Sequence, residues 1–178
     1  IDHQKAFEAV KASLTTNHWG KYNWTLYDQY GFLPSDLFDR EAVSRTLEAS
    51  FNDWCAAQLA KHLNKQGDYE FFEKRSMYYR NLYDPETGFM RGKNSDSTWV
   101  QPFDPLKISH AGTSRGDYTE ANAWQYLWSV QHDIKGLIKL MGGEENFTAK
   151  LDSLFFILEP VIIGDGLTVD VSGLIGQY

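Results

Sequence analysis

The sequence predicts an all-α fold made of antiparallel helical hairpins, with long loops at the mouth of a cavity. Apolar residues recur at helical spacing through most of the chain. Capping and helix-stopping residues bound these segments, and short turns alternate with longer loops. This alternation of helix, short turn, helix and longer loop is typical of an α/α toroid or a helical solenoid.

The first half of the chain contains four predicted helices, joined in part by short turns. Asp2 is positioned to cap the first of them, Gly31 to end the second and Asp39 to cap the third. The third helix carries an apolar stripe that widens to nearly all sides in its second half, so we expect an inner helix buried all round. A turn at 64–67 joins it to the fourth, which makes a helical hairpin. The four predicted helices cover residues 3–14, 24–30, 40–64 and 68–83.

A loop of unusual length separates the two halves. Residues 85–116 show no helical period, and we expect a short strand at 89–91 and an extended segment at 99–103. Loops of this length are usually functional or disordered, and the aromatic content argues against disorder. We therefore expect a lid or wall at a cavity mouth that brings Arg91 and Trp99 to a substrate. A surface salt bridge is an equally open interpretation of Arg91.

Three helices are predicted in the second half, over 118–129, 132–141 and 144–158. Asp117 is the expected cap of the first, and Glu120 stands three residues later as the acidic member of a capping-box-like pair. Asp133 is expected to cap the second, which the Gly142-Gly143 pair ends. The apolar run at 161–163, followed by turn residues at 164–166, predicts a short strand or an extended strap.

Composition excludes several classes of protein. A formal net charge of −7 and a pI of about 5.2 argue against a nucleic-acid partner, which requires a basic surface. No apolar run is long enough to span a bilayer. Cys55 is the single cysteine, so no internal disulfide forms, and its place in a helical pattern predicts a buried, inert thiol. The chain begins at Ile1, and we expect it to be an internal piece of a longer protein.

Glu120 and the residues that follow it carry the most informative chemistry. A carboxylate followed by Asn122, Trp124 and Gln125 suits the cleavage of a sugar, because the acid exchanges a proton, the amides bind hydroxyls and the ring stacks on a pyranose. The alternative is a helix-capping glutamate, an internal amide network and core aromatic side chains. Asp53 interrupts the apolar surface of the helix over 40–64, either as a paired core carboxylate or as part of a site wall.

The order of these motifs resembles glycoside hydrolase family 92. The central match is Tyr-Thr-Glu-Ala-Asn-Ala-Trp-Gln-Tyr at 118–126, where Ala121 replaces the glycine usual in the family. The alanine restricts the backbone next to the acid more than a glycine would. Further matching stretches cover nearly the whole chain, in order, at 53–60, 83–91, 101–105, 132–133, 136–138 and 140–143.

The resemblance implies a calcium-dependent, inverting, exo-acting α-mannosidase, for example an α-1,2-mannosidase, that acts on mannose-containing glycans. It implies that residues 1–178 are a single partial domain, roughly half of an (α/α)6 barrel. Glu120 corresponds to the general acid, while the base is expected outside this chain. No metal ligand is assigned here, and the calcium ligands are expected in the remainder of the parent chain. The family implies a periplasmic, cell-surface or secreted location. An incomplete barrel also predicts an exposed apolar surface, covered by the parent chain or by self-association.

Two alternatives remain open at the level of sequence. One is another α/α-toroid enzyme, either a different glycosidase or a polysaccharide lyase, although the acidic balance disfavours a lyase that binds uronates. The other is a non-catalytic helical glycan-binding protein of a bacterial uptake system. A substrate panel distinguishes the enzymes, and titration with α-mannosides distinguishes a binding protein from a hydrolase.

Overall fold

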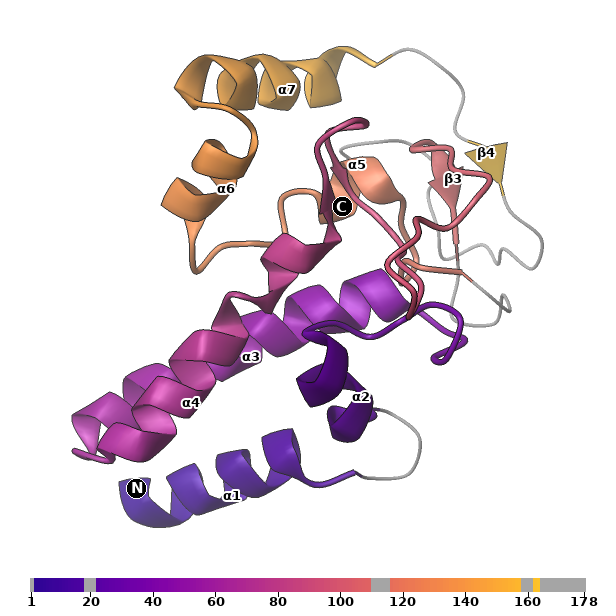
Figure 1. Cartoon of the computed structure of the whole chain (residues 1–178). Helices are drawn as coiled ribbons and strands as arrows, with labels where there is room; N and C mark the ends of the chain where they lie inside the picture. The colour runs from indigo at the N-terminus through magenta and orange to yellow at the C-terminus, as the bar shows by residue number, and fades with distance from the viewer. Residues whose placement is uncertain (1, 18–21, 110–115, 158–161, 164–178) are drawn as a thin grey trace.

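The structure, a computed structural model, describes residues 2–17, 22–109, 116–157 and 162–163 and is mostly helical. Figure 1 shows the elements in chain order. The α-helices in the described part are α1 (His3–Thr15), α2 (Trp24–Tyr30), α3 (Ala42–His62), α4 (Gln66–Ser76), α5 (Ala123–Tyr126), α6 (Ile134–Leu140) and α7 (Glu144–Phe156). Among these residues, no helix combines the length and the apolar character needed to cross a membrane.

Helices α3 and α4 form the predicted hairpin, and α4 packs along the C-terminal part of α3 (Figure 1). Helix α4 ends at Ser76, and a 3-10 helix, η1 (Tyr78–Leu82), continues the segment. The expected cap at Asp39 was wrong. The N-cap of α3 is Glu41, which adopts a left-handed φ of 55° and makes no side-chain capping bond.

Several predicted caps are confirmed by hydrogen bonds. Asp2 accepts a hydrogen bond from the Lys5 backbone N–H at 3.1 Å at the start of α1. Asp133 accepts one from the Gly136 backbone N–H at 2.9 Å at the start of α6. Gly31 ends α2 with a φ of 72°, in the left-handed region that glycine enters without a steric cost.

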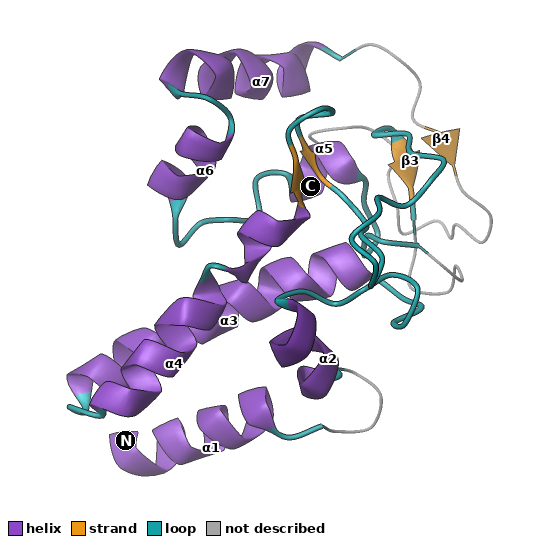
Figure 2. Ribbon diagram, viewed as in Figure 1, coloured by secondary structure: helices purple, strands orange, loops and turns teal. Residues whose placement is uncertain are grey.

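The strands are short and lie beside the helices (Figure 2). Strand β1 (Tyr83–Asp84) pairs antiparallel with β2 (Phe89–Met90), which confirms a strand at the predicted place. Strand β3 (Lys107–Ile108) pairs in parallel with β4 (Ile162–Ile163), within the predicted C-terminal strand. The turn expected at 164–166 lies outside the described residues. The segment at 99–103 is not a strand, although Trp99 forms an isolated antiparallel bridge with Lys93.

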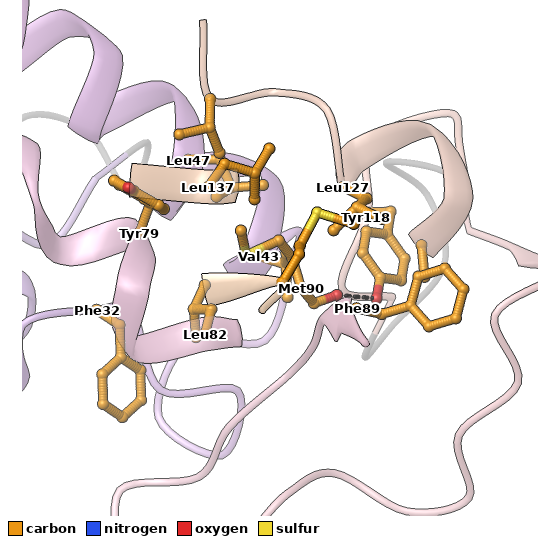
Figure 3. Close-up of a cluster of buried hydrophobic side chains, with 13 residues drawn as sticks. Phe32, Val43, Leu47, Tyr79, Leu82, Phe89, Met90, Tyr118, Leu127 and Leu137 are labelled. Carbon is orange, nitrogen blue, oxygen red and sulfur yellow. Dashed lines mark hydrogen bonds between the residues drawn. The ribbon is translucent and has the colours of Figure 1, made fainter. Parts of the chain in front are cut away.

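Helix α3 separates two cores. On one side, alanines of α3 pack with Phe7, Tyr27 and Phe72 from α1, α2 and α4. On the other, α3 meets η1, the β1–β2 hairpin, α5 and α6, as Figure 3 shows in close-up. The buried residues of this second core include Phe32, Val43, Leu47, Tyr79, Leu82, Phe89, Met90, Tyr118, Leu127 and Leu137, which Figure 3 labels.

One flank of α3 is exposed, which corrects two expectations. Glu48, Phe51, Asn52 and Cys55 follow one another at helical spacing, and all four are exposed, Phe51 to 37%. The helix is therefore not buried all round, and Cys55 is not a buried thiol. This flank is mixed in character, because Glu48 and Asn52 are polar and Phe51 is apolar.

Candidate functional site

The segment that carries Glu120 is a loop and not the first turn of a helix. The predicted helix over 118–129 is reduced to α5, and the expected capping pair of Asp117 with Glu120 was wrong. The capping box lies five residues downstream. The Asn122 side chain accepts a hydrogen bond from the Gln125 backbone N–H at 3.2 Å, and the Gln125 side chain accepts one from the Asn122 backbone N–H at 3.1 Å. Asn122 therefore starts α5.

Asp117 does not cap α5. Its side chain instead anchors the loop that precedes this helix. Its carboxylate accepts a hydrogen bond from the Ser35 hydroxyl at 2.7 Å and lies directly against Gly92, where a Cβ atom would collide with it. Burial raises the pKa of Asp117 to about 6. This side chain therefore joins three distant segments of the chain beneath the Glu120 loop.

Glu120 is held in a conformation that few residues other than glycine adopt. Its φ is 51°, in the left-handed region. Next to it, Ala121 forms an antiparallel bridge with Ser109, and the Thr119 backbone N–H donates to the Ser44 hydroxyl of α3 at 2.8 Å. The Tyr118 hydroxyl donates to the Met90 carbonyl at 2.7 Å, which anchors the start of the loop in the second core (Figure 3). Strained backbone of this kind is concentrated at functional sites.

Glu120 lines an open hollow of about 290 Å³, together with Thr119, Ala121, Gln125, Tyr126 and Ser129. Its volume is at the lower end of the roughly 300–1,000 Å³ typical of small-ligand sites. A second hollow of about 420 Å³ shares Tyr126 and Ser129 with the first and extends along the exposed flank of α3. The two hollows therefore adjoin. The remaining lining residues of the second are Leu47, Glu48, Phe51, Asn52 and Gln131.

Two polar side chains of these hollows have shifted acidities. Partial desolvation raises the pKa of Glu48, although the hydrogen bond that its carboxylate accepts from the Tyr22 hydroxyl at 3.3 Å opposes the shift. Burial also raises the pKa of Tyr126, which therefore remains a neutral phenol at physiological pH. The concave surface thus presents carboxylates, an amide and a phenol, which are groups that bind sugar hydroxyls.

Asp53 is a paired carboxylate of the interior and lines neither hollow. It is fully buried, and its Oδ2 atom lies 3.0 Å from the Nε atom of Arg75. Burial raises the pKa of Asp53 to about 7, against the opposing effect of Arg75. The interpretation of Asp53 as a paired carboxylate of the core is therefore confirmed, and its interpretation as part of the site wall is not.

The long loop does not bring Arg91 and Trp99 to the Glu120 hollow. Arg91 is 4% exposed, pairs with Asp84 at 2.7 Å and donates to the Val100 carbonyl at 2.8 Å. Its guanidinium lies 4.5 Å from the centre of the Phe103 ring and 5.9 Å from that of Trp99. Arg91 thus forms a buried ion pair with Asp84 and a hydrogen bond within the long loop, and it does not form a surface salt bridge.

Trp124 also lines neither of the two hollows. Its ring meets the Phe89 ring at a centroid distance of 4.9 Å and an interplanar angle of 76°, and the Lys150 ammonium lies 4.2 Å from its centre. This edge-to-face pair and the cation above it attach α7 to the β1–β2 hairpin. Of the residues predicted from sequence to form the site, only Glu120 and Gln125 line the hollow, with Asn122 supporting them.

Sequence reasoning did not select Glu48, Thr119 or Ser129, which complete the hollows. Glu48 is a polar interruption of the apolar stripe of α3, and that was the only signal available for it. Thr119 and Ser129 carry no pattern of their own, because their place depends on how the 118–121 loop folds against α3.

The described residues do not form a calcium site by themselves. Within them, no group of three or more His, Cys, Asp or Glu side chains comes together as a metal site requires.

The chain is similar in sequence and in fold to known proteins. The chain is 38% identical to the family GH92 α-mannosidase BT3965 of Bacteroides thetaiotaomicron in complex with mannoimidazole, with a TM-score of 0.82 over 90% of this chain and 21% of that one. It is 36% identical to the family GH92 inverting mannosidase BT2199 of the same organism, with a TM-score of 0.78 over 86% of this chain and 21% of that one.

A curated relative from Arthroderma benhamiae, described as an uncharacterized secreted glycosidase, is 30% identical over 86% of this chain and 24% of its own length. The chain thus spans about a quarter or less of the length of these relatives. The profile of the glycosyl hydrolase family 92 catalytic domain matches residues 1–178. The chain therefore belongs to glycosyl hydrolase family 92.

Proposed function

We propose that this chain is part of the catalytic domain of a longer enzyme that removes terminal α-linked mannose from glycans with inversion, and that Glu120 is its general acid. One observation carries the proposal. Glu120 lines an open hollow, on a loop whose backbone is held in a strained conformation. A relative named as an inverting mannosidase and another bound to mannoimidazole support the substrate class and the stereochemistry.

The mechanism follows from the requirements of inversion. The protonated carboxyl of Glu120 gives its proton to the departing glycosidic oxygen, while a second carboxylate activates water on the opposite face of the sugar. The two carboxyl groups of an inverting pair stand about 6.5–9.5 Å apart, which leaves room for the water. We assign the base to the remainder of the parent chain, and with it the calcium that assists mannose binding in the family.

Gln125 is the proposed sugar-binding amide of this segment. Its Oε1 atom accepts the capping bond from Asn122, which fixes the side-chain amide plane and leaves the Nε2 donors for a sugar hydroxyl. Asn122 is 1% exposed, so it positions Gln125 and does not reach the substrate from the open hollow. The other predicted site residues contribute to the stability of the fold and are not proposed to bind the sugar. They are Asp53, Arg91, Trp99 and Trp124.

The rest of the parent chain completes the proposed (α/α)6 toroid and covers the exposed flank of α3. Phe51, Phe155 and Phe156 are exposed to 37%, 70% and 78%, and these apolar side chains support the proposal of an incomplete barrel. Self-association through these faces is the alternative. The proposed location is outside the cytoplasm, in keeping with the curated relative that is described as secreted.

Glu120→Gln in the full-length protein tests the proposal. We expect kcat for hydrolysis of a mannobiose to fall by about 10²–10⁴-fold, because the amide cannot protonate the leaving oxygen, while binding of the disaccharide by calorimetry persists. Glu144→Gln, at an exposed position in the first turn of α7, is the matched control and should leave the rate unchanged. A Glu120→Gln enzyme with the wild-type rate would eliminate Glu120 as the acid. Residues 1–178 alone should show no turnover.

A further inference from the structure

Ser109 makes an unusual set of hydrogen bonds to the loop that carries Glu120. Its backbone N–H donates to the Ala121 carbonyl at 3.0 Å, and its carbonyl accepts from the Ala121 N–H at 3.2 Å. Its side-chain hydroxyl donates to the Tyr118 carbonyl at 2.7 Å and accepts from the Tyr118 N–H at 2.9 Å. One residue thus binds both backbone groups at each end of the four-residue loop 118–121.

Ser109 and its partner Tyr118 are buried, so water does not readily replace these hydrogen bonds. Ser109 is 7% exposed, and Tyr118 is 6% exposed. Removal of the hydroxyl would leave a buried N–H and a buried carbonyl of Tyr118 without this partner. From the opposite side, the Ser44 hydroxyl of α3 accepts from the Thr119 N–H at 2.8 Å. The loop is therefore held at Tyr118, Thr119 and Ala121, and Glu120 is the residue between these attachments.

These hydrogen bonds hold Glu120 in its left-handed backbone conformation. A non-glycine residue with a φ of 51° returns to a more favourable backbone region when its surroundings release it. Such a change would swing the carboxyl away from its place in the hollow, and displacement by about 1 Å can cost a catalytic group 10²-fold in rate.

We propose that Ser109, assisted by Ser44, is a positioning residue that fixes the Glu120 carboxyl at the leaving-group oxygen. This inference rests on the proposed function of Glu120. Ser109 is buried and lines neither hollow, so its loss should impair proton donation specifically and leave substrate binding unchanged.

Two substrates of the full-length enzyme separate positioning from general destabilisation. Hydrolysis of a mannobiose requires proton donation to a poor leaving group, whereas a dinitrophenyl α-mannoside releases a stable phenolate without it. For Ser109→Ala we expect kcat on mannobiose to fall about 10- to 100-fold with KM unchanged, and kcat on the aryl mannoside to change by less than about threefold. Ser44→Ala should show the same selectivity with a smaller effect, and Ser109→Thr should recover the mannobiose rate.

Ser76→Ala is the matched control, because Ser76 is also a buried serine whose hydroxyl donates to a backbone carbonyl, that of Glu73, far from the loop in sequence. It should affect neither substrate. If Ser109→Ala fails to fold, Ser44→Ala provides the same comparison. Equal losses on both substrates, or no loss on mannobiose, would overturn the positioning role.

Glu120→Gln distinguishes this inference from the function on which it rests. If Glu120→Gln is inactive on mannobiose and Ser109→Ala is not impaired, positioning by Ser109 is wrong while the general acid stands. If Glu120→Gln has the wild-type rate, both are wrong. In a Glu120→Gln background, Ser109→Ala should cause no further loss, because the group that it positions is already absent.

Discussion

Asp53 of α3 and Arg75 of α4 form an ion pair inside the protein, with 3.0 Å between Oδ2 and Nε and side-chain exposures of 0% and 1%. The same guanidinium donates to the Leu14 carbonyl at the end of α1 at 3.0 Å and lies 3.1 Å from the Asp28 carboxylate of α2. One side chain thus connects four helices.

Asp53→Ala should destabilise the protein by about 3–5 kcal/mol, because it leaves the buried charge of Arg75 without its innermost partner. Denaturant unfolding followed by circular dichroism measures the change. Asp68→Ala is the matched control on the same hairpin, since Asp68 pairs with Lys11 at 2.7 Å where both side chains are partly exposed. That loss should be no more than about 1 kcal/mol. Equal losses would show that burial of the pair does not matter.

The helical hairpin was predictable from sequence, but the network at its centre was not. The apolar spacing of 40–64 and 68–83 identifies two helices, and the turn between them requires that they pack antiparallel. Nothing in that spacing indicates that Asp53 meets an arginine 22 positions later, because such a contact depends on how α1 and α2 close over the hairpin. The sequence alone therefore did not decide whether Asp53 is a paired carboxylate of the core or part of a site wall.

The start of α5 shows how tertiary contacts decide between two local signals. Asp117 with Glu120, and Asn122 with Gln125, both have capping-box spacing. From sequence we predicted only the first pair, and we interpreted Asn122 and Gln125 as side chains of a binding site or of an amide network. The second is the one formed, because residues 118–121 are bound to Ser109 and Ser44, which are distant in sequence. Glu120 therefore lines a hollow, as predicted, but it lies in a loop and not in the predicted first turn of a helix.

The carboxyl of Asp117 should make stability depend on pH in the mildly acidic range. Its pKa is raised from 3.8 to about 6, so the folded state binds a proton more tightly than the unfolded state does. The free energy of unfolding contributed by this group therefore decreases as pH rises from about 4 to about 6 and is constant above that range.

Asp117→Asn should remove that contribution while the amide oxygen still accepts from Ser35. The difference in unfolding free energy between wild type and Asp117→Asn should change by on the order of 1–2 kcal/mol between pH 4 and 6.5. Denaturant titrations at several pH values provide the measurement. Asp133 is the internal comparison, since its pKa is lowered and its contribution has the opposite sign. Parallel profiles for wild type and Asp117→Asn would contradict the assignment.

Cys55 reports whether the rest of the parent chain covers the exposed flank of α3. Partial burial raises the pKa of its thiol, but the side chain is exposed, so a maleimide should label residues 1–178 slowly under native conditions. If the rest of the parent chain packs on this flank, as proposed, labelling of the full-length protein should be slower by on the order of tenfold or more. Mass spectrometry over a time course measures both rates. Equal rates in the two proteins would show that the flank stays open.

Asn122→Ala tests where α5 begins. Loss of the cap should lower the free energy of unfolding by about 1 kcal/mol, because the Gln125 N–H loses its acceptor. Asn122→Ser retains a capping oxygen and should recover most of that stability, whereas Asn122→Leu, which restores volume without an acceptor, should not. Recovery by leucine and not by serine would mean that Asn122 contributes through packing. Because Gln125 is oriented by the same capping box, Asn122→Ala should also raise KM for the mannobiose in the full-length enzyme, while Asn122→Ser leaves it near the wild-type value.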